Sequence, residues 1–251
     1  MTPQYYQYQS GIDINTIDTI KNFIVEGQKS LDNKNSSTDL SNSLDEVFRE
    51  SEKKEFVVKS VMNSLIKWEN HFLPEGLMLL PWRIHIYTTL PGSNNISQRW
   101  HYDTNTTNDV IFFMLNLSDC EIDDDAGTYF IDAFSSARIS LENDYISAPV
   151  LHRASNLDPF LDNTKTVNHL PSISGQLVAF QPGRTLHKGS CGKKGRRDNI
   201  HISTTVVQKS TSVKGAIGTI PLQGNAWELR DICAMEAGSF AACQTTGAPC
   251  I

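Results

Sequence analysis

The sequence contains no apolar stretch long enough to cross a bilayer, and its first residues have neither the basic start nor the apolar segment of a signal peptide. We therefore expect a cytoplasmic protein without a membrane partner. An excess of basic residues is also missing, since 22 Lys and Arg face 28 Asp and Glu, for a net charge of −6. Binding to a phosphate backbone needs a broad cationic surface, so this balance argues against nucleic acid. The short basic cluster from Lys193 to Arg197 does not reverse it.

Cysteine is scarce as well, at 5 residues, and no two of them form a CxxC pair. A structural zinc site and a disulfide framework are therefore not expected. Cys233, Cys243 and Cys250 crowd near the C-terminus, where no motif gives them a role. The acidic run from Glu121 to Asp125 lacks the alternating ligands and central glycine of a calcium loop, and it is typical of a solvated turn.

The pattern of apolar residues divides the chain into three parts. Residues 1–76 are predicted to be helical and to pack on the core, with one stripe at Ile17, Ile20 and Ile24 and a second at Val57, Val61, Leu65 and Trp68. Residues 77–210 are predicted to form the core domain. Residues 211–251 are predicted to be a C-terminal extension.

The core shows the period of two that is typical of strands. In the segment from Trp82 to Leu90, the residues Arg83, His85 and Tyr87 alternate with apolar residues. Further strands are predicted at residues 110–117, 128–133, 176–180 and 199–207, and the polar stretch 140–174 is interpreted as a long excursion between two strands. Many short strands joined by Gly, Asn and Pro turns favour a mostly β fold with flanking helices, an antiparallel sandwich or barrel.

The segment Gln98-Arg-Trp-His-Tyr-Asp-Thr104 carries the first chemical signal. Residues two apart on a strand point to the same side, so His101 and Asp103 can present an imidazole and a carboxylate to one metal ion. His187, which follows the apolar segment 175–180, is the third candidate ligand. Two histidines and one carboxylate form a facial triad that leaves coordination positions open for a chelating co-substrate and O2.

Arg197 comes ten residues after His187, beyond a glycine-rich turn that predicts a hairpin. The hairpin would bring its guanidinium back toward the metal, where a planar fork suits a carboxylate better than Lys does. Asn199, His201 and Ser203 follow on the same face and are candidates to support the anion or the substrate.

These residues resemble the iron(II)/2-oxoglutarate-dependent dioxygenase superfamily, with a distal histidine segment similar to that of prolyl hydroxylases. The likeness covers roughly residues 83–207. It implies a double-stranded β-helix (jelly-roll or cupin-like) core, with Fe(II) held by His101, Asp103 and His187. It also implies bidentate 2-oxoglutarate on the metal and the far carboxylate on Arg197. Tyr87 lies on a strand where the superfamily often places a tyrosine near this co-substrate.

The function that follows is hydroxylation of an unactivated C–H bond with O2 and 2-oxoglutarate, and Asp103 favours it because halogenating relatives lack this ligand. The expected substrate is a small amino acid, a peptide or a natural-product intermediate. Desaturation or cyclisation, an iron oxidase that does not use 2-oxoglutarate, and a non-enzymatic cupin-like binding module remain open alternatives. His85 and His201 compete for the ligand role but lack a neighbouring ligand at the right spacing, and Arg99, Arg138 and Arg184 are candidates to bind a substrate carboxylate.

Overall fold

A computed structural model describes residues 5–29, 40–48, 50–90, 100–101, 110–119, 126–131, 167–183, 185–190 and 195–208 of the chain. The helices are α1 (Ile14–Lys29), α2 (Leu44–Val47) and α3 (Ser51–Phe72). The strands are β1 (Tyr5–Gln9), β2 (Leu40–Ser43), β3 (Leu77–Thr89), β4 (Val110–Asn116), β5 (Gly127–Ile131), β6 (Val167–Pro171), β7 (Gln176–Phe180), β8 (His187–Ser190) and β9 (Arg197–Gln208).

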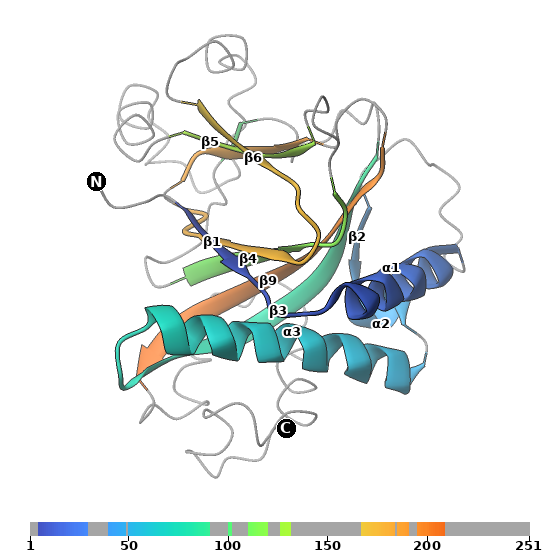
Figure 1. Cartoon of the computed structure of the whole chain (residues 1–251), viewed down its shortest axis with the longest axis horizontal. Coiled ribbons are helices and arrows are strands. Elements are labelled where there is room, and N and C mark those ends of the chain that lie inside the picture. Colours follow the sequence, from blue (N-terminus) through green and yellow to red (C-terminus); the bar gives the residue numbers. More distant parts are fainter. Residues whose placement is uncertain are drawn as a thin grey trace.

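The strands form two antiparallel sheets. The large sheet has the order β1-β7-β4-β9-β3-β2, and the small sheet has the order β6-β5-β8. The helices lie across one face of the large sheet, and the small sheet covers the other face (Figure 1). The face of the large sheet that the helices leave uncovered is thus turned toward the small sheet, and side chains from both sheets enter the space between them.

Alternation along the strands decides which side chains enter that space. On β3 and β9, Ile84, Ile86, Ile200 and Ile202 are fully buried in the cluster that packs against the helices. The two predicted helical stripes supply the other side of this cluster, as expected for amphipathic helices on a sheet. The residues that alternate with these isoleucines, among them His85, Tyr87 and His201, face the small sheet.

A second apolar cluster lies between the sheets. It joins Met114 of β4, Val178 and Phe180 of β7, Phe130 of β5 and Leu170 of β6. The rings of Phe130 and Phe180 meet edge to face with 5.1 Å between centroids. This cluster fixes the distance between the sheets and excludes water from one side of the polar residues that share the space.

The helices and the main strands agree with the sequence predictions, and β7 has the predicted bounds. Four strands, β1, β2, β6 and β8, were not predicted. β1 and β6 are edge strands whose residues are mostly exposed, so the alternation that marks a buried strand is weak there. β1 and β2 lie in the part predicted to be helical, and β6 lies in the predicted excursion 140–174.

The C-terminal extension, with Cys233, Cys243 and Cys250, lies outside the described residues, as does most of the excursion. In the described part of the chain, no helix has the length and hydropathy needed to span a membrane.

Candidate metal and co-substrate site

His101 and His187 are neighbours in the structure although 86 residues separate them in the chain. They form an antiparallel bridge in which the His101 amide donates to the His187 carbonyl at 3.0 Å and the His187 amide donates to the His101 carbonyl at 3.1 Å. Directly opposite residues of such a pair point their side chains to the same side. Their ring centroids are 4.3 Å apart, and both residues are 7% exposed. Two imidazoles thus converge at one partly enclosed point.

The ring of His187 is oriented by its surroundings. Its Nδ1 lies 2.8 Å from the Thr185 carbonyl oxygen, which can only accept a hydrogen bond, so Nδ1 carries the proton. The lone pair is then on Nε2, as a metal-binding imidazole requires. Phe180 packs edge to face on the ring at 4.8 Å and restricts its rotation. This is the support that ligating histidines commonly have.

Asp103, the predicted carboxylate ligand, lies outside the described residues. Within the described part of the chain, no three His, Cys, Asp or Glu side chains gather around one point. The structure therefore brings together two of the three predicted ligands. The third remains a prediction from the HxD spacing.

Arg197 is 3% exposed and lies at the start of β9, between the sheets. Its Nη1 donates to the Gly127 carbonyl at 2.5 Å and its Nη2 donates to Thr128 Oγ1 at 2.9 Å. Longer contacts reach Asn116 Oδ1 and Met114 Sδ, both at 3.3 Å, and the Ser190 carbonyl at 3.5 Å. These acceptors on β4, β5 and β8 hold the guanidinium plane in one orientation.

The register of the small sheet relates Arg197 to the histidine pair. Thr128, which contacts Arg197, is paired with Gly189, and Phe130 is paired with His187. Two residues of a strand therefore separate the level of the guanidinium from the level of the imidazole, about 7 Å along β5. That separation suits a short diacid with one end on a metal at His187 and the other on Arg197. The predicted hairpin between His187 and Arg197 is wrong, because β8 and β9 do not pair with each other. β8 belongs to the small sheet and β9 to the large sheet, so the two residues face each other across the space between the sheets.

Tyr87 and Asn199 lie directly opposite each other on β3 and β9. The Tyr87 ring stacks on His201 with 4.8 Å between centroids and 5° between planes. Asn199 is 1% exposed, and its Oδ1 is buried with no hydrogen-bond partner in the described part of the chain. A buried acceptor without a donor is costly, so a ligand with a donor group, or a bound water, is expected beside it.

His85 and His201 are opposite residues on β3 and β9, and their rings meet edge to face at 5.2 Å. Burial lowers the pKa of His85 to about 3, with a smaller contribution from the charge of Arg83. Burial also lowers the pKa of His201, and the positive charge of Arg197 acts in the same direction. Both rings are therefore neutral at pH 7. They belong to the large sheet, whereas His101 and His187 meet on the side of the small sheet.

Sequence reasoning missed the acceptors that orient Arg197. Asn116 and Thr128 had a usable signal, since each is a polar residue inside a buried apolar strand. Arg99, Arg138 and Arg184, the predicted contacts for a substrate carboxylate, lie outside the described residues.

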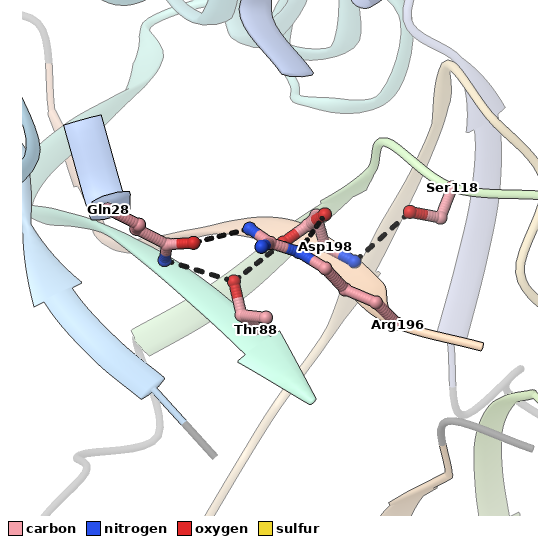
Figure 2. Close-up of polar contacts among 5 residues, drawn as sticks. All are labelled: Gln28, Thr88, Ser118, Arg196 and Asp198. Carbon is pink, nitrogen blue, oxygen red and sulfur yellow. Dashed lines mark hydrogen bonds and ion pairs between the residues drawn. The ribbon is translucent and has the colours of Figure 1, made fainter. Parts of the chain in front are cut away.

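A buried polar network fixes the backbone on both sides of Arg197 (Figure 2). Asp198 accepts hydrogen bonds from Thr88 Oγ1 at 2.6 Å and from Arg196 Nε at 2.8 and 2.9 Å. Gln28, near the end of α1, donates to Thr88 and accepts from Arg196. The Asp198 amide donates to Ser118 Oγ at 3.1 Å. Helix α1, β3 and the end of β4 are thus tied to the residues that flank Arg197, on the face opposite its guanidinium.

Asp198→Asn is expected to weaken this network, because it removes the negative charge that Arg196 and Thr88 share. Urea unfolding should show a loss of about 1.5–3 kcal/mol, the range for hydrogen bonds to charged groups. The KM for 2-oxoglutarate should rise by roughly threefold to tenfold with little change in kcat, since about 1 kcal/mol of misplacement has that effect. Asp13→Asn, at the exposed start of α1, is the matched control and should change neither quantity measurably. An unchanged KM in the destabilised variant would reduce the network to a purely structural role.

The arrangement of two antiparallel sheets with helices on one of them is the double-stranded β-helix, the fold of the 2-oxoglutarate-dependent oxygenases. Comparison with solved structures confirms it. The chain is similar to HygX from Streptomyces hygroscopicus with nickel and 2-oxoglutarate bound, with a TM-score of 0.56, 10% identity, and coverage of 81% of this chain and 83% of that one. The same protein with nickel, 2-oxoglutarate and hygromycin B bound gives a TM-score of 0.55, 12% identity, and coverage of 81% of this chain and 83% of that one.

A third similar structure is SnoK, a non-haem α-ketoglutarate-dependent carbocyclase from nogalamycin biosynthesis. Its TM-score is 0.53 at 10% identity, with 89% of this chain and 90% of that chain covered. No family model matches the sequence, and no curated protein is similar to it in sequence. Identities this low establish the fold alone, so the chemistry must be argued from the site.

Proposed function

We propose that this chain is an iron(II)- and 2-oxoglutarate-dependent oxygenase that hydroxylates a C–H bond of a small molecule or peptide. The observation that carries the proposal is the convergence of His101 and His187, with Arg197 buried about 7 Å further along the same space. Histidine nitrogens and a carboxylate are the donor set of non-haem Fe(II) sites with open positions. Asp103 is proposed as the carboxylate because it is two residues from His101.

The residues present fit these groups. His187 presents Nε2 because Thr185 fixes the proton on Nδ1, and His101 lies against it. Arg197 is a buried, permanently charged guanidinium, a group that suits a carboxylate. Asn199 Oδ1 is a buried acceptor that the described residues leave unsatisfied, at the level of Tyr87. Iron, when bound, would supply O2 activation, coupled to decarboxylation of 2-oxoglutarate to succinate.

The remaining residues define the environment of that chemistry. His85 and His201 are neutral, so they can donate or accept one hydrogen bond without adding charge next to the metal. The cluster around Phe130 and Phe180 keeps one wall dry. HygX was solved with 2-oxoglutarate bound and SnoK is an α-ketoglutarate-dependent enzyme, which supports the same co-substrate here. The cytoplasmic location and the three-part division of the chain stay predictions.

Anaerobic addition of Fe(II) and 2-oxoglutarate to the purified protein tests the proposal. The chelate on a site of this kind absorbs in the visible region, and we expect this band with saturation at one equivalent of iron. On exposure to air, the protein should form succinate in proportion to the 2-oxoglutarate consumed. Iron binding without the band, or O2 consumption without succinate, would point to an oxidase that does not use this co-substrate. Absence of iron binding would leave a non-enzymatic binding module.

A further inference from the structure

Arg83 is a second arginine on the inner face of the large sheet, and the site described above does not use it. It lies on β3 two residues before His85, so both side chains are on the same face. Its register partner on β9 is Ser203. The side chain is partly buried, and within the described part of the chain it makes no hydrogen bond or ion pair. A cation partly removed from water and without a local anion is a candidate binding group.

Strand geometry places this charge on the same face as the histidines, because Arg83 is two residues from His85 and His85 lies opposite His201. The charge of Arg83 contributes, after burial, to lowering the pKa of His85. It contributes in the same direction to the pKa of His201, on the opposite strand. Arg83, His85 and His201 therefore form one surface.

Several polar atoms on this surface are buried without a hydrogen-bond partner in the described part of the chain. They are His85 Nδ1, His201 Nε2 and Thr205 Oγ1. His85 and Thr205 are each 8% exposed. All belong to the same inner strip of β3 and β9 as Arg83. Buried polar atoms in folded proteins are nearly always satisfied, so this group of atoms indicates a polar ligand.

One bound molecule of 2-oxoglutarate cannot serve both arginines. Arg197 is paired with Thr89, and Thr89 is six residues from Arg83 along β3. At the rise of an antiparallel strand this is about 20 Å, far longer than a five-carbon diacid. The histidine pair of the large sheet lies between the two cations, at an intermediate position on the same strands. The strip thus provides two separate anion positions.

We propose that Arg83 binds a carboxylate of the primary substrate, with His85, His201 and Thr205 as hydrogen-bonding groups for the polar atoms beside it. The inference rests on the proposed function, in that the Arg197 position is assigned to 2-oxoglutarate. It narrows the substrate to a small carboxylic acid.

The test uses acetate as the probe and the full chain loaded with Zn(II) and saturating 2-oxoglutarate, which occupies Arg197. The Arg83 Nε–H resonance is assigned in 15N spectra by its loss in Arg83→Gln. Acetate is expected to shift it with a saturable Kd in the millimolar range, as one charge-assisted contact supports. Acetamide, which has the same shape without the charge, should leave it unchanged. Lys59→Gln removes an equal charge from the exposed surface of α3 and should bind acetate as the wild type does.

A resonance of Arg83 that does not move with acetate, or moves equally with acetamide, would overturn the proposal. Binding that persists in Arg83→Gln, followed through the His85 and His201 ring signals, would overturn it as well. The failure of the proposed function looks different. In that case Fe(II) and 2-oxoglutarate give no visible band, whatever acetate does at Arg83.

The second measurement concerns turnover. With Fe(II) and O2, N-acetyl amino acids and their matched carboxamides are compared for stimulation of succinate formation. The acids should stimulate and the carboxamides should not. In Arg83→Gln the acid concentration for half-maximal stimulation should rise at least about tenfold, because a lost charge-assisted hydrogen bond has this effect or more. Equal stimulation by acids and carboxamides would contradict a substrate carboxylate at Arg83.

Discussion

His187→Ala is expected to abolish the visible band of the Fe(II)–2-oxoglutarate complex and to lower succinate formation at least about a hundredfold. Loss of a group that only supports a metal ligand already reduces affinity or activity by roughly 10–100-fold, and loss of the ligand itself must exceed that. The imidazole of His187 is the one whose proton position and ring orientation the structure fixes, through Thr185 and Phe180. Its removal would therefore take away the prearranged imidazole that we propose as a ligand.

The control for this variant is His71→Ala, on the exposed side of α3. It makes the same chemical change outside the site and should keep both the band and the activity. Iron content after gel filtration separates loss of metal from loss of turnover. His101→Ala should reproduce the defect of His187→Ala, because the two rings meet at 4.3 Å. A His187→Ala protein that still forms the band with one equivalent of iron would show that the metal lies elsewhere.

The HxD motif and the distal histidine were detectable in the sequence because their chemistry is local and their spacing is characteristic. Convergence of His101 and His187 was not contained in either segment. It depends on a backbone bridge between residues in different parts of the fold. Strand alternation was also detectable in the sequence. For β3 it correctly assigned His85 and Tyr87 to the face opposite Ile84 and Ile86.

Other features had no sequence signal of their own. β1 pairs with β7 through its backbone, and its residues Tyr5–Gln9 are mostly exposed. The sequence therefore has no apolar alternation there that would predict a strand. The network at Asp198 joins Gln28 to Thr88, 60 positions away, and to Arg196, 168 positions away. Each member is an ordinary polar residue in its own segment. Only the packing of α1 against the start of β9 gives these residues a common role, as supports for Arg197.

Arg197→Gln is expected to raise the KM for 2-oxoglutarate roughly 100-fold, equivalent to about 2.7 kcal/mol, with a smaller effect on kcat. The reason is that the far carboxylate would lose a charge-assisted contact in a buried place. Arg197→Lys keeps the charge but not the planar fork, so its KM should be intermediate. Arg196→Gln is the adjacent control. It disturbs the Asp198 network on the other face and should raise KM only a few-fold, in line with a hydrogen-bond loss of about 1 kcal/mol.

A structural explanation competes with this one, because Arg197 also donates hydrogen bonds to Gly127, Thr128 and Asn116, and its loss leaves these acceptors unsatisfied. The co-substrate analogue 2-oxovalerate separates the two, since it keeps the chelating end but lacks the far carboxylate. If Arg197 acts on that carboxylate, wild type and Arg197→Gln should use 2-oxovalerate with similar KM. The rise in KM caused by removing the guanidinium and the rise caused by removing the far carboxylate should then not add. If the variant is as impaired with 2-oxovalerate as with 2-oxoglutarate, the guanidinium only holds β4, β5 and β8 together, and the carboxylate must bind at another residue.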